Sequence, residues 1–337
     1  MPQTGSDYAF HAIFGMLRGA RGETAAGEES GAIAHGGESR IPAGAGPWRV
    51  SVAAVNTSAE DMDELIRMLQ EAGIEAEPFF KAMNETDEKG GLVLPEAELF
   101  LCVGPEETGY FAECLNSDAA ARALSVAPPV GLEGSRRWIR VIAKALGKTV
   151  PDTPPWAGRI PAAADNEGKN LSGIRAYLSL PLSWAPGFAG LIREMGGDIA
   201  GISVDAVDQT GLDYLRKLEP LISGSEPNDQ APLIHVSGFQ EFELYNILGK
   251  RRPSLFVGRG SQVLTAARMG IPSISLDSRA FYGIRGAVRF VEAALRAVRF
   301  HGFPDILKDD ETGGAPAYEH RWAERRPDWY IKLEGKY

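Results

Sequence analysis

The feature that most constrains the fold is a repeated alternation between short apolar runs and helical patterns. Residues 252–298 show it most clearly, because an apolar run stops at Gly258-Arg259-Gly260-Ser261 and a helical pattern follows. Gly270-Ile271-Pro272 then leads into a second apolar run, and a Gly-punctuated loop leads into another helical pattern. Strands that alternate with helices at this spacing are typical of parallel sheets with crossover helices. The pattern therefore predicts an α/β protein.

The alternation occurs in two stretches, which a segment rich in Pro, Gly and polar residues separates. The first opens with the strand pattern WRVSVAAVN and the helix pattern SAEDMDELIRMLQEAGI, which has a Ser cap and an acidic first turn. We predict two doubly wound parallel-sheet, Rossmann-like domains with a hinge. The expected organisation is an N-terminal helix and mobile Gly/Ala/Glu-rich loop (1–46), a first domain (47–150), a linker (151–172), a second domain (173–301) and a C-terminal tail (302–337).

Composition indicates a globular protein that binds neither nucleic acid nor membranes. The formal net charge of -10 opposes the basic surface that nucleic-acid binding requires. No apolar run approaches the roughly 20 residues that span a bilayer, and the N-terminus lacks the pattern of a secretory signal. Two cysteines do not make a disulfide framework. We therefore expect a cytoplasmic protein.

Candidate binding residues follow from the rule that open α/β sheets bind ligands beyond the carboxyl ends of their strands. The rule selects the loops after Val103, Leu180, Val236, Val257 and Leu276. In one of them, Gly258, Gly260 and Ser261 lead into a helix N-terminus, which attracts anions, and Arg259 could add a charged contact. The alternative is a tight strand-to-helix turn, which the bare GxG pattern favours.

Two further residues stand at strand ends. His235 ends an apolar run and is expected to point toward the same crevice, although a lone His there is more often a satisfied hydrogen-bonding group. Cys102 ends the strand pattern AELFLC, where a thiolate could bind a soft metal or an iron–sulfur cluster. A buried cysteine that packs as a small hydrophobic residue is the alternative. For Cys114, inside a helix pattern, the structural interpretation is favoured.

The ordered motifs of the last third support a family resemblance. Arg252-Pro253-Ser254, Gly270-Ile271-Pro272 and Tyr282-Gly283-Ile284-Arg285-Gly286-Ala287 resemble, in this order, the final domain of nitrogenase component 1 proteins. The earlier stretches DMDELIRMLQEAGIEAEPFF and AELFLCVGPEETGYFAECL look like the second domain of that family. The resemblance covers roughly residues 45–300.

The resemblance implies binding of an iron–sulfur cluster or a metallocluster derived from one, with Cys102 as the metal ligand. It also places Tyr282 and Arg285, which belong to the last of the three motifs, among the expected cofactor-binding residues. The implied partners are a second component 1-type subunit and an ATP-dependent iron protein, as in nitrogen fixation. Ser275-Leu276-Asp277 stands where catalytic subunits of the family supply a His, and PPVGLEGS looks more like their partner subunits.

Three functions are consistent with these observations. The first is a nitrogenase-like component 1 subunit or scaffold, which holds a metallocluster or reducible substrate in an interdomain cleft. The second is a two-domain nucleotide-sugar glycosyltransferase or epimerase, in which the Gly-rich turn holds a diphosphate and Asp277 contacts the ribose. The third is a non-catalytic structural subunit that keeps the fold.

Overall fold

The computed structural model describes residues 48–79, 95–117, 121–149, 170–205, 211–222, 232–236, 240–277 and 280–299. These residues form two compact units. Unit 1 contains the described residues up to 149, together with the described parts of Pro181–Leu191 and Ser278–Arg289. Unit 2 contains the described parts of Glu167–Leu180 and Ile192–Asp277, and residues 290–299. The N-terminal helix and mobile loop, nearly all of the linker, and the C-terminal tail expected from the sequence lie outside the described residues.

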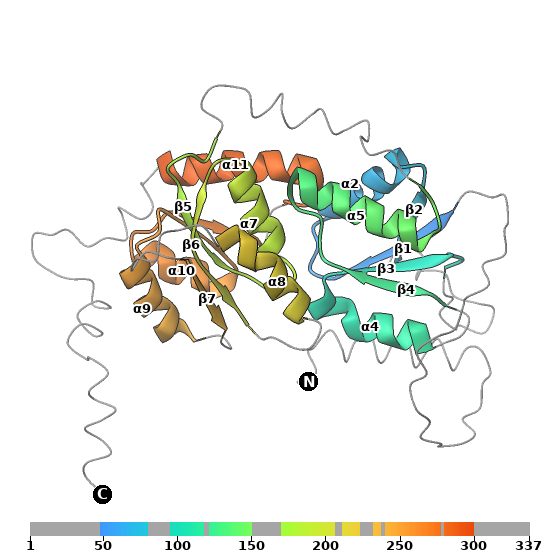
Figure 1. Cartoon of the computed structure of the whole chain (residues 1–337), viewed down its shortest axis with the longest axis horizontal. Coiled ribbons are helices and arrows are strands. Elements are labelled where there is room, and N and C mark those ends of the chain that lie inside the picture. Colours follow the sequence, from blue (N-terminus) through green and yellow to red (C-terminus); the bar gives the residue numbers. More distant parts are fainter. Residues whose placement is uncertain are drawn as a thin grey trace, which may run out of the picture. The chain divides into compact units, whose positions relative to one another are not determined.

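Unit 1 is built on a four-stranded parallel sheet in the order β2-β1-β3-β4. The chain moves outward from β1 to β2 and in the opposite direction from β3 to β4. Since crossovers between parallel strands are right-handed, this reversal puts α4 on one face and α2 on the other, where α5 joins it (Figure 1). The strands are β1 (Arg49–Ala54), β2 (Glu75–Pro78), β3 (Leu99–Val103) and β4 (Ala123–Val126), and the helices are α2 (Ala59–Glu71), α4 (Pro105–Ser117) and α5 (Gly131–Ala145).

Helix α2 forms where the sequence signals predict it. Ser58 caps its start, because the Ser58 hydroxyl accepts a hydrogen bond from the Asp61 N–H at 3.0 Å. Met68 and Leu69 lie about one helical turn after Leu65, so the three side chains share one face of the helix, and all three are fully buried. Gly73 follows the helix with a φ of 74°, the left-handed conformation that glycine adopts without strain.

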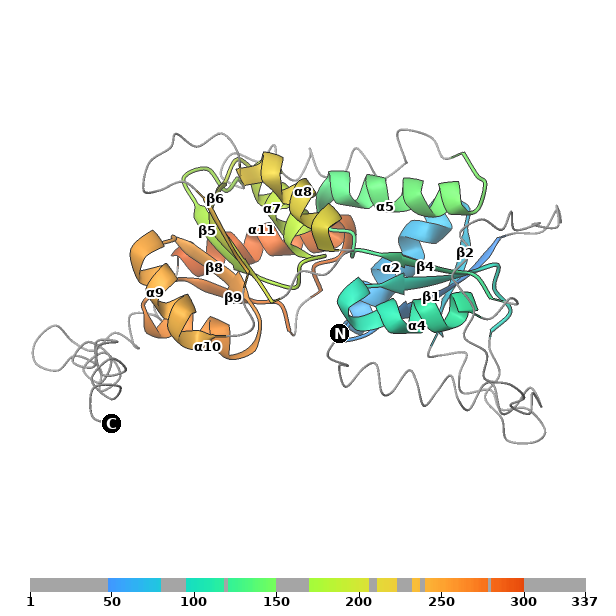
Figure 2. The same ribbon diagram turned by 60° about the horizontal axis from the view of Figure 1, so that its bottom comes forward.

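Unit 2 is built on a five-stranded parallel sheet in the order β7-β6-β5-β8-β9. From β5 the chain first adds β6 and β7 on one side, and it then returns to add β8 and β9 on the other side of β5. Because of this reversal, α9 and α10 cover one face of the sheet and α8 lies on the other (Figure 2). The strands are β5 (Arg175–Ser179), β6 (Asp198–Val204), β7 (Leu233–Val236), β8 (Leu255–Gly258) and β9 (Ser273–Ser275). The remaining helices are α7 (Ala185–Glu194), α8 (Gly211–Ile222), α9 (Glu241–Arg251), α10 (Gly260–Arg268) and α11 (Gly283–Arg299). Two doubly wound parallel-sheet domains, as the sequence predicts, are confirmed.

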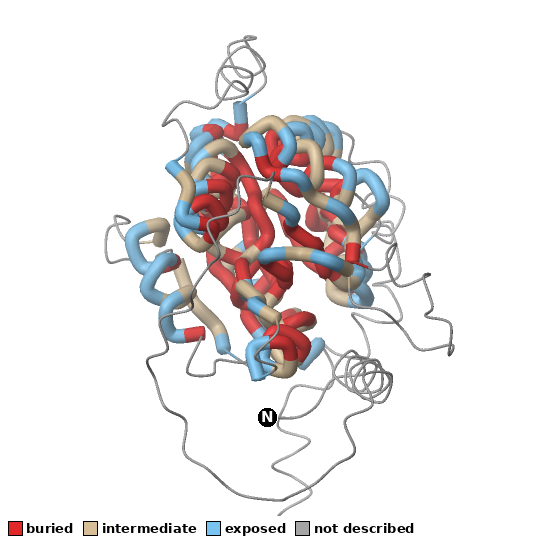
Figure 3. Tube along the Cα trace, turned by 90° about the vertical axis from the view of Figure 1, so that its right-hand side faces the viewer, coloured by how far each residue is buried: buried red, intermediate tan, exposed pale blue. Residues whose placement is uncertain are grey.

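The central strands of each unit, β1 and β3 in unit 1 and β5, β6 and β8 in unit 2, are almost entirely buried, and Figure 3 marks the buried segments in red. In unit 1, Phe79 packs against Phe100 and Phe111 on the α4 side of the sheet. In unit 2, Tyr177 stacks on Phe256 with ring centroids 6.2 Å apart. Parallel strands covered on both faces are apolar along their whole length, which is why the sequence shows continuous apolar runs.

None of the helices in the described residues is long and apolar enough to cross a membrane.

Candidate functional site

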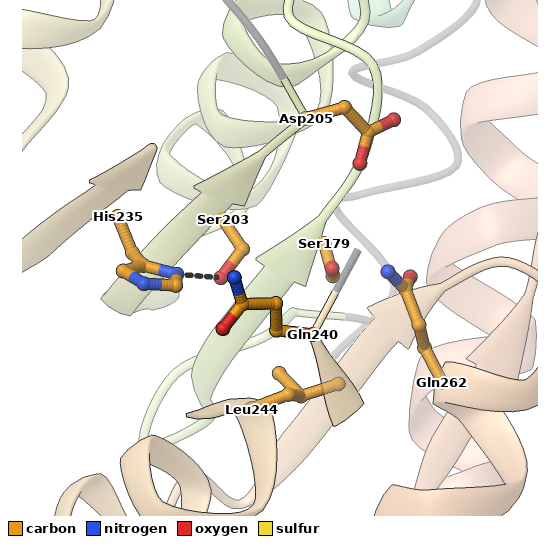
Figure 4. A pocket seen from close by; sticks show the side chains of 7 residues that line it. All are labelled: Ser179, Ser203, Asp205, His235, Gln240, Leu244 and Gln262. Carbon is orange, nitrogen blue, oxygen red and sulfur yellow. Dashed lines mark hydrogen bonds between the residues drawn. The ribbon is translucent and has the colours of Figure 1, made fainter. Parts of the chain in front are cut away.

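A polar pocket lies in unit 2 beyond the carboxyl ends of three adjacent strands, β5, β6 and β7. Its volume is about 20 Å³, which is room for a group of about the size of a water molecule. The strands supply Ser179, Ser203 and His235 (Figure 4). Leu244 comes from α9, Gln262 from α10, and Gln240 directly precedes α9. The lining residues are Ser179, Ser203, Asp205, His235, Gln240, Leu244 and Gln262.

Strand register brings His235 and Ser203 together. They are paired residues of neighbouring parallel strands, and His235 Nδ1 lies 3.4 Å from Ser203 Oγ. The other ring nitrogen of His235, Nε2, is 3.0 Å from a carboxylate oxygen of Glu243 in the first turn of α9. His235 is therefore held at both ring nitrogens, and its ring is directed at the Ser203 hydroxyl (Figure 4).

Ser203 has a second hydrogen-bond partner in Tyr177. The Tyr177 hydroxyl lies 2.6 Å from Ser203 Oγ, and the Tyr177 side chain is completely buried. Gly201 makes room for the Tyr177 ring, because a Cβ at Gly201 would lie 2.7 Å from it. Burial raises the pKa of Tyr177 to about 12, so its hydroxyl remains protonated at neutral pH. Loss of hydration likewise raises the pKa of the Asp205 carboxyl, and the positive charge of Arg259 lowers that pKa by a smaller amount.

The Gly-rich turn expected to hold an anion is occupied by a side chain of the same unit. One carboxylate oxygen of Asp277 accepts the Gly260 N–H at 2.6 Å, and the other lies 3.0 Å from Arg259 Nε. The Ser275 hydroxyl adds a third hydrogen bond to Asp277 at 3.1 Å. The structure thus brings Gly258, Arg259, Gly260, Ser261 and Asp277 together, and Asp277 supplies the negative charge that the α10 N-terminus attracts.

These contacts change the ionisation of Asp277. Burial alone would raise the pKa of its carboxyl, but the hydrogen bonds from Gly260, Arg259 and Ser275 outweigh burial and lower that pKa. Asp277 therefore stays ionised at neutral pH. A diphosphate at this turn would have to displace a carboxylate that is already bound.

Tyr282 directly precedes α11 and Arg285 lies in its first turn, and this part of unit 1 packs on α2. The Tyr282 N–H donates to Asp61 at 2.7 Å, and the Tyr282 ring meets Trp184 edge-on at 5.6 Å. Arg285 Nε lies 3.7 Å from a carboxylate oxygen of the buried Glu64. The start of α11 fits tightly, because a Cβ at Gly283 would lie 2.6 Å from Glu64 Cγ. The contacts of both residues within unit 1 hold the start of α11 against α2.

The family model described as nitrogenase component 1 type oxidoreductase matches residues 3–299. The chain belongs to this family. No curated protein sequence gives a match.

Solved structures agree with this assignment. Nitrogenase Cp1 at pH 6.5 aligns with a TM-score of 0.59 and 15% identity, covering 89% of this chain and 66% of that one. Nitrogenase Cp1 at pH 5 aligns with a TM-score of 0.56 and 15% identity, covering 80% of this chain and 59% of that one. The component 1-type chain thus spans less than two thirds of either structure, and the likeness is one of fold.

The surroundings of Cys102 are apolar. In β3 its side chain is completely buried and packs with Phe100, Phe111 and Leu115 on the α4 side of the sheet. Burial raises the pKa of the Cys102 thiol to about 12, so the thiol is protonated at neutral pH in these apolar surroundings. This environment matches the packed-core alternative. A ligand role for Cys102 stays a prediction.

The described residues do not fit an iron–sulfur cluster. Among them, no three His, Cys, Asp or Glu side chains gather closely enough to hold a metal ion. Iron–sulfur clusters are held mainly by cysteine thiolates, usually four of them, and the whole sequence contains only Cys102 and Cys114. Cys114 packs at the edge of the same apolar cluster as Cys102.

Sequence reasoning missed most of the polar pocket. Ser203 is the second-last residue of β6 and Asp205 follows that strand, whose end the strand-end rule did not select, and Glu243 was not among the candidates. One signal was available: Ser179 and Ser203 are each a polar residue near the carboxyl end of a mostly apolar strand.

Proposed function

We propose that this chain is a component 1-type subunit of a nitrogenase-like reductase or of its cofactor-assembly scaffold. The family match over residues 3–299 is the observation that carries the proposal. In this function the chain works with a second component 1-type subunit and with an ATP-dependent iron protein, in the cytoplasm.

We further propose that any metallocluster of the assembly is bound through residues of another chain. The apolar surroundings of Cys102 and the presence of only two cysteines in the sequence support this division of roles. When bound, such a cluster would supply electrons to a substrate. The contribution of this chain is then structural, or it holds the reducible substrate.

A non-catalytic structural subunit is the second candidate, and the same observations on Cys102 favour it. The nucleotide-sugar alternative has less support, because Asp277 already binds the Gly260 N–H that a diphosphate would need.

Anaerobic purification from a host that assembles iron–sulfur clusters tests the proposal. The chain is expressed with a tag, alone and together with a second component 1-type chain, and its mass is measured by light scattering. We expect an assembly of two or more component 1-type chains, and no iron or sulfide in the chain purified alone. A monomer in both preparations would contradict the partner role. Iron that is bound by the chain alone and lost in Cys102→Ala would contradict the division of roles.

A further inference from the structure

Three side chains of unit 2 form a carboxylate–imidazole–hydroxyl series. Glu243 Oε2 lies 3.0 Å from His235 Nε2, and His235 Nδ1 lies 3.4 Å from Ser203 Oγ. Because a carboxylate only accepts hydrogen bonds, the proton of neutral His235 is placed on Nε2, and Nδ1 is left to accept from Ser203. A hydroxyl beside a base that a third group orients is the arrangement that activates a serine nucleophile.

Tyr177 is the other hydrogen-bond partner of Ser203. Its buried hydroxyl is protonated and lies 2.6 Å from Ser203 Oγ, and either oxygen can be the donor of this bond. When Ser203 gives its proton to His235, Tyr177 is left as the donor to Ser203 Oγ. If Ser203 loses this proton, the hydrogen bond from Tyr177 remains and stabilises the anionic oxygen.

The pocket gives a substrate access to Ser203. Gln240 and Gln262 also line it, and their amide N–H groups can donate to an oxygen that becomes negative during a reaction. None of its described lining residues is Lys or Arg, which disfavours phosphates and other anions. Its volume of about 20 Å³ is room for one group of about the size of a water molecule, such as the carbonyl oxygen of an ester.

We propose that Ser203 is a nucleophile for acyl transfer from small uncharged carboxylic esters. His235 is the base, and Glu243 and Tyr177 are positioning residues. The proton of Ser203 moves to His235 Nδ1 as the bond between Oγ and the carbonyl carbon forms. The bond from that carbon to the ester oxygen then breaks, and the departing oxygen takes the proton from Nδ1. Water releases the acyl group as a carboxylic acid along the same proton path, and Ser203 is restored. This activity does not depend on the proposed function.

The test uses p-nitrophenyl acetate with the purified full-length chain. Release of p-nitrophenolate is followed by absorbance, and the acetylated residue is identified by peptide mass spectrometry. We expect acetyl-Ser203 in the wild-type chain and loss of the catalysed release in Ser203→Ala. Ser172→Ala is the matched control, because Ser172 is an exposed serine of the same unit and is not a lining residue of the pocket, and it should retain the activity.

Further variants separate catalysis from structural support. His235→Ala should lower the rate on the order of 10²-fold, as expected for loss of a general base. Glu243→Gln should lower the rate with no change in melting temperature, since the Glu243 side chain is 43% exposed, and Glu243→Asp should recover part of it. Acetylation confined to lysines or to other serines would overturn the proposal. Equal rates in the wild type, Ser203→Ala and Glu243→Gln would overturn it as well.

Discussion

Replacing Asp61 by Asn should change how the stability of unit 1 depends on pH. Asp61 is 5% exposed and accepts the Tyr282 N–H at 2.7 Å. Burial raises the pKa of its carboxyl from 3.8 to about 6, although hydrogen bonds from Tyr282 and Ser58 and the charge of Arg289 act in the opposite direction. An Asn amide keeps an oxygen to accept the Tyr282 N–H and does not ionise.

The raised pKa fixes both the sign and the size of the effect. Because the folded state binds the proton more tightly than the unfolded chain, Asp61 favours folding below pH 3.8, and this contribution is lost as the pH rises to about 6. A difference of roughly two pKa units corresponds to about 3 kcal/mol. The unfolding free energy of Asp61→Asn, relative to the wild type, should therefore be about 3 kcal/mol higher at pH 7.5 than at pH 4 or slightly below.

Urea unfolding of both proteins at several pH values between 3.5 and 7.5 measures this difference, since other titrating groups cancel in the comparison. Asp63→Asn is the control, because it makes the same substitution at an exposed position of the same helix and leaves the buried carboxyl of Asp61 in place. A constant difference for Asp61→Asn over the same pH range would refute the reasoning.

Three further predictions concern Cys102, Gly286 and Asp277. Cys102→Ala should cost about 1 kcal/mol in urea unfolding and leave the iron content, measured by colorimetric assay, unchanged; loss of iron would restore the ligand role. Gly286→Ala should destabilise unit 1 by several kcal/mol in a thermal melt, because the added methyl group would overlap the backbone carbonyl of Phe281. Gly134→Ala is the control, because its added methyl group meets open space in α5, and it should be neutral or slightly stabilising. Asp277→Ala should cost about 1 kcal/mol at pH 7 by removing the cap of α10, and because the pKa of Asp277 is lowered, this difference should shrink as the pH falls below about 4.

The sequence alone determined the secondary structure and the class of fold, because those depend on local patterns. Ser58 and Gly73 mark the ends of α2 through their own backbone and side-chain chemistry. Apolar runs that alternate with helical patterns favour parallel strands with crossover helices, and this pattern is read from the sequence alone. The ordered Gly270-Ile271-Pro272 and Tyr282–Ala287 motifs also indicated the family that the comparison confirmed.

Only the tertiary structure decided which side chains meet. The strand containing Cys102 is apolar on both faces, so its sequence does not say whether the sulfur faces α4, α2 or the crevice, and packing against Phe111 decided it. Asp277 and Gly260 are 17 positions apart, and the polar pocket depends on the pairing of Ser203 with His235 across two strands. Strand register is a contact between distant segments, and a shift by one residue would turn each side chain to the opposite face of the sheet.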